Sequence, residues 1–262
     1  MHLNTLDWIE NLEAALGVLI DENAELPMMA RTHGQPATPT TLGKELNVFK
    51  QRLNKEKKTL EEQEFFAKWG GATANYNPHL LAFPQADWLT HSEKFLDELE
   101  LKLTKVSTQI EPHDYMAKVF HNLMRVNTIL IDFSQDIWTY ISFDYFKLKL
   151  DKNEVGSSTM PHKVNPIDFE NAEGNLGLAN ALFNHLAEKL PRSRLQRDLS
   201  DSTVLRNIGS AYGYMELSVS SLLKGISKLE ANVETIANDL NDRYELLAEP
   251  LQSFLRLEGK KL

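Results

Sequence analysis

The segment from Gly156 to Pro166 places hydroxyls, a histidine, a lysine and an asparagine between two long helical patterns. A serine hydroxyl has no basicity at neutral pH, so Ser157 can act as a base only if its alkoxide is stabilised. Lys163 and the backbone N–H groups of the Gly-Ser-Ser turn can supply that stabilisation. Asn165 is suited to cap a helix that begins at Pro166, which puts Lys163 beside a positive helix end. We therefore predict a mobile loop that binds a carboxylate or phosphate and carries a base, instead of an ordinary connection.

A second group of reactive side chains lies near the N-terminus, where Thr32 and His33 precede Gly34. Histidine exchanges a proton near neutral pH, so His33 can serve as an acid or a base. Pro36 and Pro39 restrict the segment that carries it, which we expect to be a loop. A lone histidine with a structural role is the alternative, and the residue types leave both interpretations open.

Arginines accumulate in a third segment, which contains Arg192, Arg194, Arg197 and Arg206 together with Ser202. The segment also contains two aspartates, so the four arginines leave a local excess of two positive charges in an acidic chain. Ser202 and Arg206 are four residues apart, so they share one face of a helix. Guanidinium groups near a helix start favour a phosphate ligand. A set of surface salt bridges is the alternative.

Composition excludes several classes of function. The net charge of −9, from 37 acidic and 28 basic residues, argues against a nucleic-acid surface, which needs a basic face. Cysteine is absent, so there is no disulfide framework or thiolate chemistry, and the eight histidines lack metal-ligand spacing. With no long apolar run and no leader sequence, we expect a cytoplasmic protein without a membrane span, a metal or a cofactor.

Apolar residues recur at helical spacing along most of the chain, and we find no convincing strand. The sequence therefore predicts an all-α protein, a bundle of long antiparallel helices. Thr40 or Thr41 should open the second helix, and Ser200 or Asp201 should cap the fifth. The long helices are expected at 1–25, 41–67, 116–141, 166–190 and 200–230. Shorter ones are expected at 87–99, 233–240 and 244–257, with an irregular segment at 72–86.

Four motifs in order resemble those of the adenylosuccinate lyases in the fumarase/aspartase superfamily. The first is the eleven-residue segment Gly156–Pro166, in which His162 precedes Lys163. The others are Arg31–Thr38, Thr108–Tyr115 and Asp198–Asn207. Because the motifs are spread over the chain, the resemblance covers nearly all of it.

The resemblance implies release of fumarate from adenylosuccinate, leaving AMP, and from the succinylaminoimidazole carboxamide ribotide of purine synthesis. It implies that Ser157 removes the proton from the succinyl carbon and that His33 protonates the departing nitrogen. Lys163 and Asn165 would hold the succinyl carboxylates, and Gln109 would position the substrate. The residues implied to bind substrate are Thr32, Gln109, Ser158, Lys163, Asn165, Arg197, Ser202 and Arg206.

The resemblance also implies a homotetramer whose long helices form a common core and whose active sites combine segments of three subunits. We expect residues 1–226 to be the central catalytic domain and 227–262 the start of a C-terminal helical domain. Relatives carry an N-terminal domain with a further conserved region and more chain after Leu262, so we expect this chain to be truncated at both ends. Argininosuccinate lyase or fumarase chemistry, and a helical assembly fragment without activity, remain alternatives.

We predict that the 262-residue chain assembles through its helices but cleaves adenylosuccinate poorly or not at all. The expected reason is that part of each active site is missing from it. Native mass and fumarate release measured on the same purified sample test this, and robust turnover would contradict it.

Overall fold

The computed structural model describes residues 2–149, 163–241 and 243–260, and it divides into two compact units. The first unit contains Glu56–Thr128 and Asn175–Glu216, together with the first residues of the chain. The second contains Leu3–Lys55, Ile129–Gly174 and Leu217–Leu262. The long helices α2, α5, α6 and α8 contribute residues to both units, and α1 belongs to the second apart from His2.

Helices dominate the structure, which confirms the predicted all-α class. The long helices are α1 (His2–Glu22), α2 (Leu42–Glu61), α5 (Asp114–Ser142), α6 (Ile167–Lys189) and α8 (Ile208–Lys228). The short ones are α3 (Asn77–Ala82), α4 (Trp88–Asp97), α7 (Ser200–Leu205), α9 (Val233–Leu240), η1 (Tyr244–Leu247) and α10 (Ala248–Leu257). Thr41 caps α2 as predicted, because its hydroxyl accepts a hydrogen bond from the Lys44 N–H at 3.2 Å.

The expectation of no strands was wrong, because the described residues include six short strands in three separate pairs. They are β1 (Pro27–Thr32), β2 (Gln35–Thr41), β3 (Phe66–Ala67), β4 (Lys102–Leu103), β5 (Phe146–Leu148) and β6 (Leu229–Ala231). β1 pairs antiparallel with β2, β3 parallel with β4, and β5 antiparallel with β6. All three pairs lie next to helix ends, and each pair joins two non-helical segments of the chain.

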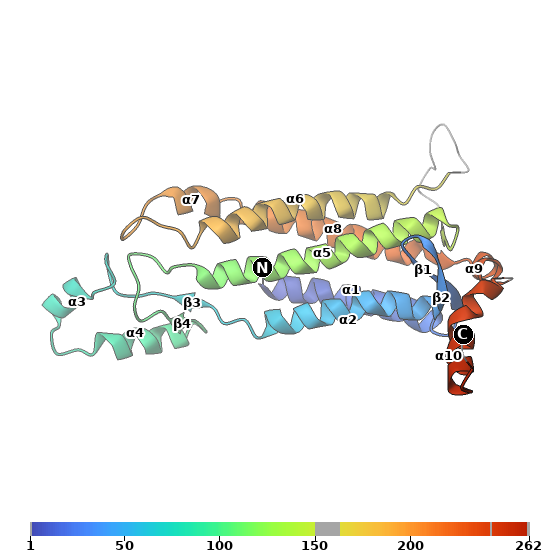
Figure 1. Ribbon diagram of the computed structural model, residues 1–262. Helices are drawn as coiled ribbons and strands as arrows, with labels where there is room; N and C mark the ends of the chain where they lie inside the picture. Colours follow the sequence, from blue (N-terminus) through green and yellow to red (C-terminus); the bar gives the residue numbers. More distant parts are fainter. Residues whose placement is uncertain (1, 150–162, 242, 261–262) are drawn as a thin grey trace. The chain divides into compact units, whose positions relative to one another are not determined.

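The second unit has a continuous apolar core. Figure 1 shows α1 running beside α2, and Gly43 allows their ends to meet because a Cβ there would lie 2.7 Å from the Ala24 Cα. Phe133 on α5 makes edge-to-face contacts with Phe49 and Phe169, at centroid distances of 5.4 and 6.2 Å. The apolar side chains buried here include Ile9, Leu12, Leu16, Leu46, Leu53, Ile137 and Leu222.

The first unit packs its helices around a column of aromatic rings. Phe120 of α5 stacks on Phe183 of α6 at 5.6 Å, and Phe183 meets Tyr212 of α8 edge-on at 5.4 Å. Beside them, buried Asn127 donates a hydrogen bond to Asn180 at 2.9 Å. This polar pair fixes the register of α5 on α6 more specifically than apolar contacts alone. At the edge of this unit α4 lies beside β3 and β4 (Figure 1).

Three predicted helices differ from those observed, and the last of them, expected over 244–257, is divided into the 3₁₀ helix η1 and α10. The second was expected to reach Ala67 but ends at Glu61, because Phe65 and Phe66 leave the helix and contact the ring of Tyr115. The fifth was expected to be continuous over 200–230, but a turn at 206–207 separates α7 from α8. In addition, α3 lies in the segment 72–86 that was expected to be irregular.

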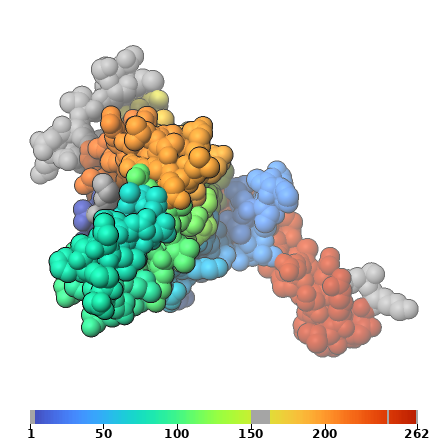
Figure 2. Space-filling model, turned by 90° about the vertical axis from the view of Figure 1, so that its left-hand side faces the viewer, coloured from blue at the N-terminus to red at the C-terminus, as the bar shows by residue number. Residues whose placement is uncertain are grey.

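The C-terminal helix α10 has no buried residue, although its sequence is strongly amphipathic. Leu251, Phe254 and Leu257 are 56%, 58% and 85% exposed. Figure 2 shows this segment, in red, standing away from the rest of its unit. Among the described residues no helix is long and apolar enough to cross a membrane.

An ion pair joins the start of α6 to the end of α8. The Asp168 carboxylate accepts a hydrogen bond from Lys228 at 2.8 Å, and both side chains are about seven-eighths buried. Lys224 adds a longer contact at 3.9 Å.

We predict that Asp168→Asn destabilises the protein by about 3 kcal/mol, because it removes the negative charge from a largely buried ion pair. That loss corresponds to a fall of roughly 6–12 °C in Tm. Thermal unfolding followed by circular dichroism measures it. Asp7→Asn, which removes an exposed carboxylate on α1, is the matched control. Equal Tm values for the two variants would contradict the prediction.

Candidate functional site

The candidate residues fall into two groups, one in each unit. Thr32, His33, Lys163 and Asn165 belong to the second unit, whereas Gln109, Arg197, Ser202 and Arg206 belong to the first. The predicted base Ser157 and the neighbouring Ser158 lie outside the described residues. The site is therefore described as two separate parts.

His33 forms the tip of a β-hairpin and does not lie on a proline-rich loop as expected. Thr32 pairs with Gln35, so His33 and Gly34 alone make the turn. Their φ angles are 54° and 72°, the left-handed values of a two-residue type I′ turn. Glycine suits the second position, and histidine tolerates the first better than most residues. The imidazole is exposed, so it is accessible to a ligand.

A cluster around Asp239 of α9 holds this hairpin in place. The Asp239 carboxylate accepts a hydrogen bond from the Arg31 guanidinium at 2.7 Å and another from the Tyr145 hydroxyl. The Arg31 guanidinium also lies 4.9 Å from the centre of the Phe143 ring, a cation–π contact. Since Arg31 is two residues before His33, this cluster holds the strand that leads to the turn.

In the cluster around Asp239, the hydrogen-bond donors stabilise the charged form of the carboxylate. Burial opposes ionisation of Asp239, yet the hydrogen bonds from Tyr145 and Arg31 prevail and lower the pKa of its carboxyl below the usual range. Burial of Tyr145 and its bond to Asp239 raise the pKa of that phenol. The carboxylate therefore stays charged and the phenol stays protonated, which keeps the hydrogen bond donated by Tyr145 in place at neutral pH.

Lys163 and Asn165 precede α6, whose start differs slightly from the prediction. The Phe169 and Glu170 N–H groups donate to the Pro166 carbonyl at 3.0 and 3.2 Å, so Pro166 occupies the N-cap position that was predicted for Asn165. The helix begins at Ile167. Lys163 is exposed and Asn165 is half-buried. The Asp168–Lys228 pair fixes the first turn of this helix directly after them.

The structure brings Gln109 to the arginine loop, which we define as residues 191–199. The Gln109 N–H donates a hydrogen bond to the Gln196 carbonyl at 3.3 Å, immediately before Arg197. Glu111 secures this segment, since its carboxylate accepts from the His113 N–H at 2.7 Å and the Thr104 hydroxyl at 3.2 Å. Burial raises the pKa of Glu111, but the hydrogen bonds from His113 outweigh it, so the pKa lies below normal. Two of the predicted substrate-binding residues are thus neighbours.

Asp198 organises the arginine loop itself. Its carboxylate accepts hydrogen bonds from the Ser200 N–H at 2.7 Å and the Arg194 N–H at 3.1 Å, and it pairs with the Arg194 guanidinium at 3.2 Å. Hydrogen bonds from Ser200 lower the pKa of Asp198 to about 2. Because Asp198 already binds the Ser200 N–H, the predicted cap at Ser200 or Asp201 was wrong, and α7 begins after Leu199.

The three predicted phosphate ligands differ in their surroundings. Arg197 is paired with Asp201, with 3.8 Å between Nη2 and Oδ2. Ser202 is half-buried in α7, and Arg206 is exposed at the C-terminal end of that helix. No ion pair of Arg206 is found within the described ranges.

A cavity of about 370 Å³ lies beside the arginine loop, lined by Lys189, Arg192, Ser193, Arg194, Asp198 and Ser200. Its cations have a structural explanation. Lys189 donates to the Arg192 carbonyl at 2.9 Å, and Arg192 donates to the Glu188 carbonyl at 2.7 Å. Arg192 therefore satisfies a carbonyl in the last turn of α6, and Lys189 one in the loop that follows it. Arg197, Ser202 and Arg206 do not line this cavity.

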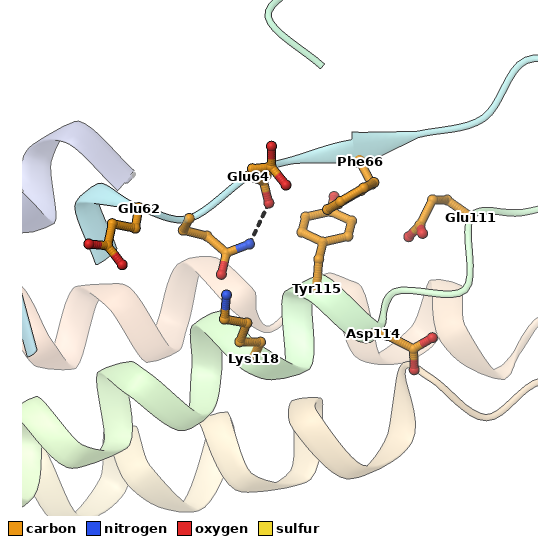
Figure 3. Close-up of a pocket in the computed structure, with 8 residues that line it drawn as sticks. Glu62, Glu64, Phe66, Glu111, Asp114, Tyr115 and Lys118 are labelled. Atoms are coloured by element: carbon orange, nitrogen blue, oxygen red, sulfur yellow. Dashed lines mark hydrogen bonds between the residues drawn. The ribbon is translucent and has the colours of Figure 1, made fainter. Parts of the chain in front are cut away.

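A second cavity in the same unit, of about 430 Å³, has an acidic lining (Figure 3). Glu62, Glu64, Glu111 and Asp114 surround it, against the single cation Lys118. The ring of Tyr115 faces Phe66 across it, 5.9 Å between centroids. The excess of carboxylates disfavours a phosphate here. Across the described parts of the chain, no group of three or more His, Cys, Asp or Glu side chains could hold a metal ion.

Sequence reasoning assigned no functional role to Asp239, Tyr145 or Asp201. Asp239 accepts hydrogen bonds from Tyr145 and from Arg31, which lies two residues before His33, and Asp201 pairs with Arg197. Asp239 and Tyr145 are 208 and 114 positions after Arg31, so no local pattern connects them with it. Asp201 did carry a signal, because it lies four residues after Arg197, the spacing of an ion pair along a helix.

Comparison with known proteins identifies relatives along the whole chain. The sequence profile of the family described as Lyase matches residues 2–180, and that described as Adenylosuccinate lyase C-terminal matches 193–261. The chain is 52% identical to the adenylosuccinate lyase of Vibrio cholerae over 252 residues, covering 96% of this chain and 55% of that protein. It is 56% identical to the adenylosuccinate lyase of Dictyostelium discoideum over 237 residues, covering 89% and 51%.

A solved structure shares the fold at low sequence identity. The 3-carboxy-cis,cis-muconate lactonizing enzyme of Pseudomonas putida superposes with a TM-score of 0.78 at 20% identity, covering 97% of this chain and 56% of that one. This likeness concerns the fold alone. The chain spans about half the length of the relatives it matches.

We predict that His33→Asn preserves the hairpin whereas His33→Val destabilises it by about 1–2 kcal/mol, because a β-branched residue is strained at positive φ. Amide hydrogen exchange of Thr32 and Gln35 measures the opening of the hairpin. Thr38→Val, at an exposed strand position, is the control and should leave the exchange rates unchanged. Equal rates in the Asn and Val variants would show that the turn does not hold His33 at positive φ.

Proposed function

Because this chain belongs to the lyase family whose profile matches residues 2–180, we propose that it is part of an adenylosuccinate lyase. The observation that carries the proposal is its 52–56% identity to adenylosuccinate lyases over about nine-tenths of its length. Every candidate residue lies within one of the two matched ranges, Thr32 to Asn165 in the first and Arg197 to Arg206 in the second.

The proposed reaction is an elimination that needs a base and an acid on opposite sides of the breaking bond. Ser157 removes a proton from the succinyl carbon, and the electron pair left behind forms the double bond of fumarate. The C–N bond breaks, and His33 gives a proton to the departing nitrogen of AMP. The same steps release fumarate from the succinylated carboxamide ribotide. The exposed imidazole at a rigid turn supports the role of His33.

The proposed binding residues divide the substrate between its two charged ends. Lys163 and Asn165 hold the succinyl carboxylates, with Thr32 and Ser158 beside them, and stabilise the charge that builds up on one carboxylate in the carbanion. At the other end Arg197, Ser202 and Arg206 bind the nucleotide phosphate, and Gln109 positions the substrate. The hydrogen bond between Gln109 and Gln196 supports this second group, because it holds Gln109 beside Arg197.

We further propose a homotetramer in the cytoplasm with active sites shared between subunits. Val18, Leu178 and Leu217 on the long helices are 61%, 52% and 57% exposed, which supports association of helix faces. A chain without cysteine is compatible with a reducing compartment. Residues 1–226 are the proposed catalytic domain and 227–262 the start of the C-terminal domain.

Two other functions are distinguishable. Another fumarate-releasing lyase, such as one acting on argininosuccinate, would use the same acid and base, but its substrate has no phosphate for Arg197 and Arg206. A helical assembly fragment without chemistry would bind no nucleotide. A panel of succinylated substrates, followed by ultraviolet absorbance of fumarate, separates the first, and AMP binding separates the second.

We predict that Ser157→Ala, in a protein with the full length of its relatives, abolishes fumarate release from adenylosuccinate and leaves the oligomer mass unchanged. General acid–base catalysis contributes about 10²–10⁴-fold, so the loss should be at least of this size. Turnover assays and native mass measure both properties. His33→Asn, which keeps a residue that tolerates the turn, should show the same loss. A lost tetramer in Ser157→Ala would assign the residue a structural role.

A further inference from the structure

Asp201 combines deep burial with incomplete pairing. Its residue is 3% exposed, and its Oδ1 has no hydrogen-bond partner among the described residues. Its Oδ2 lies 3.8 Å from Nη2 of Arg197, an ion-pair distance that is longer than a hydrogen bond. A buried carboxylate that lacks partners is costly, so its position requires an explanation.

Asp198, the other aspartate of this segment, differs from Asp201 in its hydrogen-bond partners. Asp198 accepts hydrogen bonds from two backbone N–H groups, so it holds the loop itself. Asp201 has no such backbone partner in the described structure and faces the guanidinium of Arg197. The two carboxylates therefore differ in role: Asp198 stabilises the backbone, and Asp201 acts on one cationic side chain.

We propose that Asp201 is a positioning residue that orients the guanidinium of Arg197 toward the phosphate of a nucleotide. This inference rests on the proposed function. A guanidinium has five N–H donors in a fixed plane, so contact with a carboxylate on one edge leaves another edge for a bidentate contact with phosphate. The Arg197 side chain is 35% exposed, so its free edge is accessible. Asp201 itself is buried behind it and does not touch the ligand.

For Asp201→Asn, a positioning role predicts a change in anion affinity opposite in sign to the change expected from net charge alone. Asp201→Asn removes one negative charge from the phosphate site, which by Coulomb attraction alone would tighten the binding of an anion. If Asp201 orients Arg197, the same substitution weakens binding, because the guanidinium loses its fixed direction. Glu188→Gln removes one charge from the exposed end of α6 without touching Arg197, so it is the matched control.

The test is calorimetric titration of AMP into a protein with the full length of its relatives, in its wild-type form and as each variant. We expect Asp201→Asn to raise the Kd for AMP by about tenfold, the equivalent of one charge-assisted hydrogen bond. Glu188→Gln should leave the Kd unchanged or lower it slightly. Inorganic phosphate should compete with AMP, and less effectively in Asp201→Asn than in the wild type.

A double-mutant cycle separates positioning from a structural role. In the Arg197→Ala background, Asp201→Asn should have no further effect on the Kd, because there is no guanidinium left to orient. The same tenfold loss in both backgrounds would mean that Asp201 supports the fold, and would overturn the proposal. So would an unchanged or lower Kd for Asp201→Asn alone.

The outcomes also distinguish this inference from the function on which it rests. If the wild type does not bind AMP, or if Arg197→Ala does not weaken binding, the proposed phosphate site is wrong and Asp201 has no role in it. If binding depends on Arg197 but not on Asp201, the phosphate site stands and only the positioning role fails.

Discussion

The hydrogen bonds to the Asp239 carboxylate determine how the second unit presents its candidate acid. Arg31 and Tyr145 both donate to this carboxylate, although they lie 208 and 94 positions away from it in the sequence. The strand that carries Arg31 continues for one more residue before the turn at His33. A part-buried ion pair thus fixes the strand that leads to the turn, and the turn carries the exposed imidazole.

The first unit uses the same principle at its arginine loop. Long helices supply the framework, but the side chains proposed to bind phosphate are set by loop contacts at helix ends. Asp198 organises the loop, and the bond from Gln109 to the Gln196 carbonyl joins the loop to the segment before α5. Irregular segments that are fixed by hydrogen bonds can hold functional groups as firmly as helices do, because their polar groups are paired.

Periodicity predicted much of the fold, since α9 at Val233–Leu240 and the helix containing Met116–Ile141 were located closely. The strands were missed because β3 and β4 contain two residues each and pair across 36 positions, which leaves no alternating pattern to detect. The hairpin was partly detectable, because a His-Gly pair suits a type I′ turn, but its prolines suggested a loop. Residue types and resemblance identified the candidate site. Asp239 and the burial of Asp201 required the three-dimensional structure, although the four-residue spacing of Asp201 from Arg197 is visible in the sequence.

The type I′ turn has a consequence for how binding free energy is used. A two-residue turn has little conformational freedom, so His33 loses its backbone entropy when the protein folds and not when a ligand arrives. The backbone of His33 is therefore preorganised. Binding of a ligand to its imidazole costs less conformational entropy than it would on a flexible loop. The pairing of β1 with β2 is irregular between Met29 and Arg31, and such an irregularity bends a strand locally, so it helps to set the direction in which the turn points.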